Sequence, residues 1–236
     1  MSDKRVIIPI ICFFLAVTIV FSGCSSLLAF PNFVIQHYSF DGHEVLYDPN
    51  DPDVDKAITE YTNYLESNPE SAFMYYHRGL AYLFNGEYDK AITDFTKAID
   101  LDPEYAYAYN MRGRAYYDKG EYDKAISDCN NAIEIEKDPK YIAAYYYNRG
   151  FSYDATGEYD KSIADYTKAI EMDSKIDSAH YRNASRLDSA YYRRGLAYKA
   201  KGEYDLAASD FEKAVQIALD PKVVEAARQA LNDIEK

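Results

Sequence analysis

Apolar residues recur along most of the chain at the three- and four-residue spacing of amphipathic helices. One such apolar stripe consists of Ala91, Ile92, Phe95, Ala98 and Ile99. Comparable stripes follow one another from residue 53 to the C-terminus, separated by short segments that contain Gly, Pro or Asp. The pattern predicts a chain of short helices.

A motif of the form Tyr-x-x-Arg-Gly-x-x-Tyr recurs four times within these helices. Its glycines are Gly79, Gly113, Gly150 and Gly195, at spacings of 34, 37 and 45 residues. Each copy is followed by Gly-Glu-Tyr-Asp, which begins at Gly86, Gly120, Gly157 and Gly202. Recurrence of one motif at intervals of 34 to 45 residues is typical of an array of similar structural units.

This pattern resembles the tetratricopeptide repeat family over roughly 180 of the 236 residues. The resemblance implies an all-α fold, a right-handed α-solenoid of helix-turn-helix tetratricopeptide repeats. In that family the first helices of successive units line a concave groove that binds the ligand.

The repeated residues also have a physical explanation. A glycine in the middle of a helix costs roughly 1 kcal/mol relative to alanine, so Gly79 and its equivalents predict a close crossing of the second helix. Gly86 and its equivalents are expected to end the first helix in a left-handed conformation. Asp89 and its equivalents are candidate caps of the second helix. An Arg precedes an Asp by 16 residues in all four units, which predicts four structural ion pairs.

The predicted organisation has nine segments. They are a signal peptide (1–23), a lipid-anchored tether (24–52), a leading half repeat (53–69), full repeats at 72–105, 106–142, 143–176 and 188–221, a helix-extending insertion (177–187) and a capping helix (222–236). The tether region is poorly patterned, and we expect neither helix nor strand there. The insertion is expected to start the last unit's first helix near Ile176 or Asp177, and an 11-residue surface loop is the alternative.

The N-terminus has the features of a targeting segment. Lys4 and Arg5 precede a 16-residue apolar stretch, Val6 to Phe21, which is short for a spanning helix. The following Ser22-Gly23-Cys24 resembles the lipobox of bacterial and archaeal lipoproteins, whose cysteine is lipidated. A membrane-anchored lipoprotein of the cell envelope, facing outside the cytoplasm, is therefore expected. A retained signal anchor and a cleaved secreted form are the alternatives.

Composition excludes several function classes. Acidic residues exceed basic ones by 39 to 26, and a net charge of −13 disfavours nucleic-acid binding. Three cysteines cannot form a disulfide framework, and Cys129 is expected to be a buried core residue. The sequence contains no catalytic, metal-ligand or phosphate-loop motif, so we expect no enzyme, no metal and no cofactor.

The predicted function is a membrane-tethered scaffold that binds an unknown protein or peptide partner, at the cell envelope, through its concave groove. Positions carried over from the family place these residues in the groove: Phe73, Tyr76, Leu80, Phe84, Tyr107, Asn110, Arg114, Tyr117, Tyr147, Phe151, Tyr192 and Leu196. Alternatively, some of them pack between units or lie under the tether. A second functional hypothesis is a lipoprotein that binds a glycan or small solute on its tyrosine rings.

Overall fold

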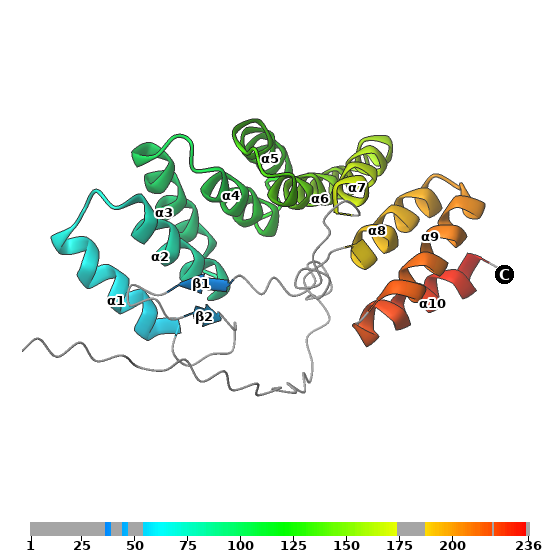
Figure 1. The fold of residues 1–236 in the computed structure, drawn as a ribbon, viewed down its shortest axis with the longest axis horizontal. Coiled ribbons are helices and arrows are strands. Elements are labelled where there is room, and N and C mark those ends of the chain that lie inside the picture. Colours follow the sequence, from blue (N-terminus) through cyan, green and yellow to red (C-terminus); the bar gives the residue numbers. More distant parts are fainter. Residues whose placement is uncertain (1–35, 39–43, 47–53, 174–186, 219, 235–236) are drawn as a thin grey trace, which may run out of the picture. The chain divides into compact units, whose positions relative to one another are not determined.

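The computed structural model describes residues 36–38, 44–46, 54–173, 187–218 and 220–234. Ten helices follow one another in these ranges (Figure 1). They are α1 (Val54–Ser67), α2 (Ala72–Phe84), α3 (Tyr88–Leu101), α4 (Ala106–Asp118), α5 (Tyr122–Ile135), α6 (Pro139–Thr156), α7 (Tyr159–Asp173), α8 (Leu187–Ala200), α9 (Tyr204–Ile217) and α10 (Pro221–Ile234). None of these helices is long and apolar enough to cross a membrane.

Two short strands precede the helices. β1 (Gln36–Tyr38) pairs antiparallel with β2 (Glu44–Leu46), and His37 lies opposite Val45. This hairpin was not predicted, because strands of three residues are too short to show an alternating pattern. The Asp41-Gly42 dipeptide between the strands is a turn-favouring pair that could have indicated it.

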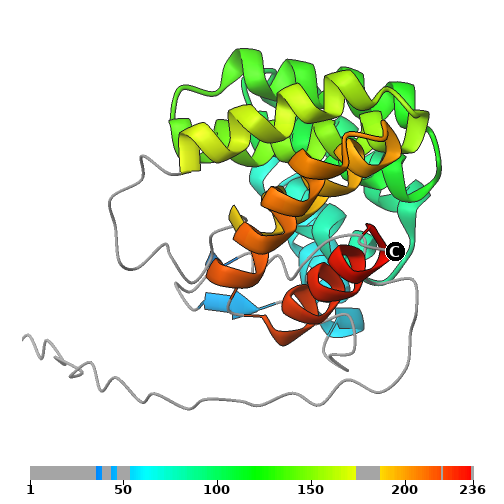
Figure 2. The same ribbon diagram turned by 90° about the vertical axis from the view of Figure 1, so that its right-hand side faces the viewer.

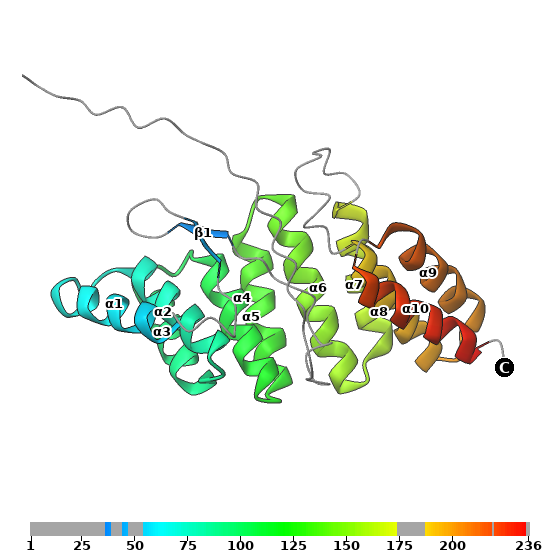
Figure 3. The same ribbon diagram turned by 90° about the horizontal axis from the view of Figure 1, so that it is seen from below.

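The helices pack as successive antiparallel pairs. Helix α2 packs on α3, α4 on α5, α6 on α7 and α8 on α9, and each pair also contacts the next one along the chain. Figure 3 shows neighbouring helices side by side in chain order. The compact unit Phe33–Lys236 is therefore an α-solenoid of helix-turn-helix units preceded by a hairpin.

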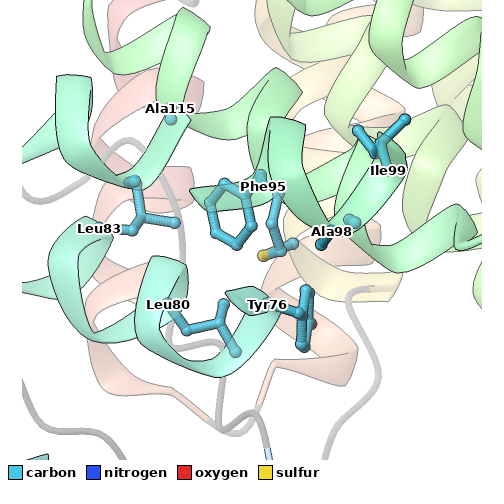
Figure 4. Close-up of a cluster of buried hydrophobic side chains, with 10 residues drawn as sticks. Tyr76, Leu80, Leu83, Phe95, Ala98, Ile99 and Ala115 are labelled. Atoms are coloured by element: carbon cyan, nitrogen blue, oxygen red, sulfur yellow. The ribbon is translucent and has the colours of Figure 1, made fainter. Parts of the chain in front are cut away.

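The core of the first unit shows why a mid-helix glycine recurs. The Phe95 side chain of α3 is fully buried and lies between Leu80, Leu83 and Tyr76 of α2 (Figure 4). A methyl group on Gly79 would lie 2.8 Å from a ring carbon of Phe95. The predicted close crossing of the two helices is confirmed.

The turns between paired helices share one glycine conformation, but one predicted helix cap is wrong. Gly86, Gly120, Gly157 and Gly202 have φ between 75° and 79°, so the predicted left-handed turn is confirmed. The prediction that Asp89 caps α3 is wrong. Glu87 precedes the first residue of that helix, and Asp89 lies within the first turn, where its charge favours the helix dipole.

The two ends of the array differ from its middle. Helix α1 packs on α2 as the second helix of a unit would, and α10 packs on α8 and α9 (Figure 2). The outer side of α10 exposes Glu225, Arg228 and Gln229 to solvent, as expected of a capping helix. The predicted signal segment, Cys24 and most of the insertion lie outside the described residues.

Candidate functional site

The first helices of the units form a layer of their own. Helix α2 contacts α4, α4 contacts α6, and α6 contacts α8. Over the described helices, the second helices α3, α5, α7 and α9 make no such contacts with one another. Because the first helices approach one another more closely, they lie on the inner side of the stack.

The solvent-accessible side of this layer is called the inner face below. It is built by exposed or half-buried side chains of α2, α4 and α8, namely Phe73, Phe84, Tyr107, Arg114, Tyr117, Tyr192, Arg193, Leu196 and Lys199. Phe73 is the most accessible of its large apolar residues, with 44% of its surface exposed. Seven of the twelve predicted groove residues are part of this face.

The other five predicted groove residues are buried. They are Tyr76, Leu80, Asn110, Tyr147 and Phe151, each at most 3% exposed. Side chains at these positions pack between adjacent units, as Tyr76 and Leu80 do in one cluster with Met111 of α4. In this structure the five residues pack within the array, and contact between them and a partner stays a prediction.

Tyr147 shows the packing role most clearly. Its ring lies 5.7 Å from the Tyr166 ring of α7 and 6.3 Å from the Phe151 ring, measured between centroids. Ala190 of α8 belongs to the same cluster. Replacement of Tyr147 by alanine should therefore lower stability as well as change any binding surface.

A buried amide pair joins the second and third units. The Asn148 side-chain nitrogen donates a hydrogen bond to the Asn110 side-chain oxygen at 2.9 Å. Asn148 also accepts at its backbone oxygen from the Ser152 hydroxyl, at 3.2 Å. The sequence analysis did not select Asn148, because it considered only the family's groove offsets and Asn148 lies at an adjacent position.

Aromatic and cationic side chains of α4, α6 and α8 contact one another next to the inner face. The Tyr117 and Phe151 rings are 4.9 Å apart and steeply inclined, at 62°. The Arg193 guanidinium lies over the Phe151 ring at 4.3 Å from its centroid, a cation–π distance. Burial raises the pKa of the Tyr117 hydroxyl to about 12, so this ring is neutral at physiological pH.

Two carboxylates accompany these cations. Asp118 accepts from Arg114 at 2.8 Å one helical turn away, and Asp154 accepts from the Tyr166 hydroxyl at 2.7 Å. Burial raises the pKa of both carboxyl groups above the usual value. Aromatic rings, arginines and partly desolvated carboxylates therefore lie close together beside the inner face.

The four predicted ion pairs are confirmed. In each unit the arginine makes a two-pronged contact with the aspartate 16 residues later, at 2.7 to 2.8 Å. The remaining guanidinium nitrogen donates to the preceding unit, as from Arg112 to the Thr96 hydroxyl at 3.1 Å. These arginines connect units and are not an anion site.

Cys129 is a core residue, as predicted. It is 1% exposed, and burial raises the pKa of its thiol to about 12. A thiol with that pKa is not a nucleophile at neutral pH. Among the described residues, no group of three or more His, Cys, Asp or Glu side chains could hold a metal ion.

Two profiles of the tetratricopeptide repeat match the chain. One matches residues 53–92 and 76–142, and the other matches residues 143–175 and 189–220. Together they span more than half of the chain. No curated protein matches it.

Solved structures give the same result. The crystal structure of MamA is 32% identical, with a TM-score of 0.60, and the match covers 70% of this chain and 88% of that one. A MamA structure from Desulfovibrio magneticus RS-1 (20% identity, TM-score 0.60, covering 70% of this chain and 86% of that one) shares the fold. So does TTC0263, a tetratricopeptide repeat protein of Thermus thermophilus (22% identity, TM-score 0.58, covering 76% of this chain and 91% of that one). The chain belongs to the tetratricopeptide repeat family.

Proposed function

We propose that this chain is a membrane-tethered scaffold whose inner face binds an extended peptide or a helix from a partner protein. Tetratricopeptide repeat proteins are generally scaffolds for protein partners and not enzymes. The observation that supports this role here is the layer of first helices with its accessible aromatic side chains. Interface centres are enriched in aromatic residues and arginine, which are the residue types found on this face.

The glycan-binding alternative has less support. A sugar-binding site needs ring faces that are open to the ligand, whereas most inner-layer tyrosines pack on other rings. Tyr76 lies 5.0 Å from Tyr105, and Tyr107 lies 4.9 Å from Tyr141. Aromatic residues arranged in this way stabilise the array.

The tether is proposed from sequence alone. Cys24 follows the apolar stretch of a signal segment and occupies the lipidated position of a lipobox. Two acyl chains would hold the array at a membrane surface of the cell envelope, outside the cytoplasm. The partner would then be an envelope protein.

Binding is tested with a pair of matched variants. Phe73→Ser removes an accessible ring from the inner face, and Tyr204→Ser removes an even more exposed ring, 55% accessible, from α9. We expect proteins captured from envelope extracts by the parent chain to be lost with Phe73→Ser and retained with Tyr204→Ser. Truncation of an anchor ring typically costs about 2 kcal/mol, roughly 30-fold in affinity. Equal capture by both variants would contradict the assignment of the inner face.

The anchor is tested separately. Intact-mass analysis of the parent chain should show a lipidated chain that begins at Cys24, and Cys24→Ala should abolish lipidation and signal removal. An unmodified parent chain that begins at Met1 would refute the lipoprotein assignment without affecting the binding assay.

A further inference from the structure

Helix α1 begins the row of helices (Figure 1) and takes the place of a second helix. Arg78 of α2 donates a hydrogen bond to the Thr62 hydroxyl of α1 at 3.2 Å. The same contact joins the next two units, where Arg112 of α4 donates to Thr96 of α3 at 3.1 Å. In the part of the chain that the structure describes, α2 is the one helix that packs on α1. The side of α1 that would receive its own first helix therefore has no helix against it.

This side of α1 is more accessible than its counterparts in the complete units. Ala57 and Tyr61 are half-buried, whereas the residues at the same two positions of α3, α5, α7 and α9 are at most 1% exposed. Those residues are Ala91, Phe95, Ala125, Cys129, Ser162, Tyr166, Ala207 and Phe211. Each of them is covered by the first helix of its own unit. The side of α1 built by Ala57, Glu60 and Tyr61 is called the open face below.

Glu60 gives the open face an unpaired negative charge. In the complete units, the residue at this position is an aspartate that accepts two hydrogen bonds from the arginine of its own first helix. Glu60 is exposed, and among the described residues it has no arginine or lysine partner. A carboxylate can accept a guanidinium in the same two-pronged geometry. The open face therefore combines apolar surface with an acceptor for an arginine.

The residues before α1 do not supply this arginine. From Val6 to Asp53 the sequence contains neither arginine nor lysine. The cation that fits Glu60 must therefore come from elsewhere.

Helix α10 of a second copy is a poor fit to the open face. Its Arg228 and Gln229 follow Arg194 and Gly195 of α8 by 34 residues, so a glutamine stands at the glycine position of the motif. A single methyl group on Gly195 would already lie 2.7 Å from a ring carbon of Phe211. A glutamine at this position prevents the close crossing that buries the facing ring.

We propose that the open face of α1 binds a helix of a partner protein that carries an arginine followed by a small residue. The array shows this fit four times, because each first helix places Arg-Gly against the aspartate and the buried side chain of its second helix. Aromatic residues three positions before and four positions after the arginine complete the match, as Tyr75 and Tyr82 stack on Arg78. This site belongs to α1 and is separate from the inner face, so the scaffold has a second surface for a partner.

The test uses a helix of this chain as the probe. A fluorescein-labelled peptide of residues 187–201, which contains Arg194 and Gly195, is titrated with the full chain in detergent at physiological ionic strength. Binding is followed by fluorescence anisotropy. Glu60→Arg reverses the charge of the open face, and Glu66→Arg is the matched control, because Glu66 is exposed on a different side of α1. Both positions are exposed, so the array remains folded, and thermal unfolding by circular dichroism checks this.

We expect the parent chain and Glu66→Arg to bind the peptide equally, and Glu60→Arg to bind it at least about tenfold more weakly. A second peptide that carries Arg194→Glu should show the reverse order, with at least about tenfold tighter binding to Glu60→Arg than to the parent, because the two charges are exchanged. General attraction of a basic peptide to a chain with a net charge of −13 would not depend on which glutamate is changed.

The proposal would be overturned by the absence of peptide binding to the parent chain, or by equal losses with Glu60→Arg and Glu66→Arg. Self-association of the parent chain in sedimentation velocity, abolished by Glu60→Arg, would place a second copy on the open face instead. Failure of peptide binding while Phe73-dependent capture persists would refute this inference and leave the proposed function standing. The opposite pair of results would refute the function of the inner face alone.

Discussion

At the residue scale, the repeated arginine–aspartate pairs show what the motif residues contribute. The aspartate side chains are only 5 to 7% exposed, and burial raises the pKa of Asp128 and Asp165 even beside their arginines. A buried ion pair recovers its desolvation cost only with good geometry. Each pair here has two-pronged geometry. The third guanidinium hydrogen bond, to the preceding unit, makes each arginine specific for the register in which the units stack.

His77 is a second buried polar residue, and it leads to a pH prediction. Its ring lies 4.1 Å from Phe73 and 5.3 Å from Tyr76, and burial lowers its pKa from 6.5 to about 4. The unfolded chain gains a proton near pH 6.5, whereas the folded chain gains it only near pH 4. The contribution of neutral His77 to the free energy of unfolding is therefore fully present above about pH 6.5. It is lost as the pH falls towards 4, which lowers the free energy of unfolding by on the order of 3 kcal/mol.

Urea unfolding at pH 7 and pH 4.5 tests this prediction. We expect the parent chain to lose more free energy of unfolding over this interval than His77→Phe, which cannot take up the proton. The comparison between the two chains removes the contribution of the carboxylates, which titrate in both. Parallel losses in the parent and the variant would show that His77 is not the buried base described above.

At the element scale, the two kinds of glycine have different roles. Gly86 and its equivalents are needed for a left-handed turn, with no atom within 4 Å of an added methyl group. Gly79 is needed for space, because the ring of Phe95 fills the position of its missing side chain. The equivalent Gly113 faces Cys129, whose sulfur is 3.5 Å away, and the Ala125 carbonyl oxygen at 3.1 Å.

This difference predicts that Gly79→Ala and Gly113→Ala have unequal costs. Alanine gains about 1 kcal/mol of helix propensity at both positions, but overpacking typically costs about 1 to 3 kcal/mol. We expect Gly79→Ala to lower the free energy of unfolding and Gly113→Ala to be nearly neutral, measured by urea denaturation. If the two variants were equally unstable, the size of the facing side chain would not decide the cost.

The helices and their pairing were predictable because the same signals recur four times. Gly79, Gly113 and their equivalents mark a close crossing, and periodic apolar residues mark the buried side. The caps were not predictable in the same way: Glu and Asp are both present in Gly-Glu-Tyr-Asp, and the choice of first residue depends on the turn geometry. The hairpin gave no periodic signal.

At the scale of the whole molecule, the prediction of groove residues was limited by distances between units. Phe73 and Tyr117 are accessible, whereas Tyr76 and Tyr147 are buried, although all four lie at groove positions of the family. A repeat motif specifies what one unit contains. It does not specify how closely the next first helix approaches, and that distance decides which side chains remain accessible.

A stack in which each unit contacts only its neighbours predicts that damage spreads locally. Helices α8 and α9 contact α7 and α10, whereas α6 and α7 have full units on both sides. Phe211 and Tyr166 fill equivalent, fully buried positions in the last and third units. Loss of either ring should lower the free energy of unfolding by about 3 to 5 kcal/mol, and this loss should fall on its own unit and the adjoining interfaces.

Hydrogen exchange measured by mass spectrometry would show this pattern. With Phe211→Ala, we expect protection to fall in α8, α9 and α10 and to be retained in α2 to α5. Tyr166→Ala should lower protection in the helices on both sides of α7, because a central unit supports two neighbours. Glu225→Ala, on the exposed side of α10, is the control that should change neither region. Equal loss of protection in all helices with Phe211→Ala would instead mean that the array unfolds as one cooperative unit, so that the coupling between units exceeds the free energy lost with the ring.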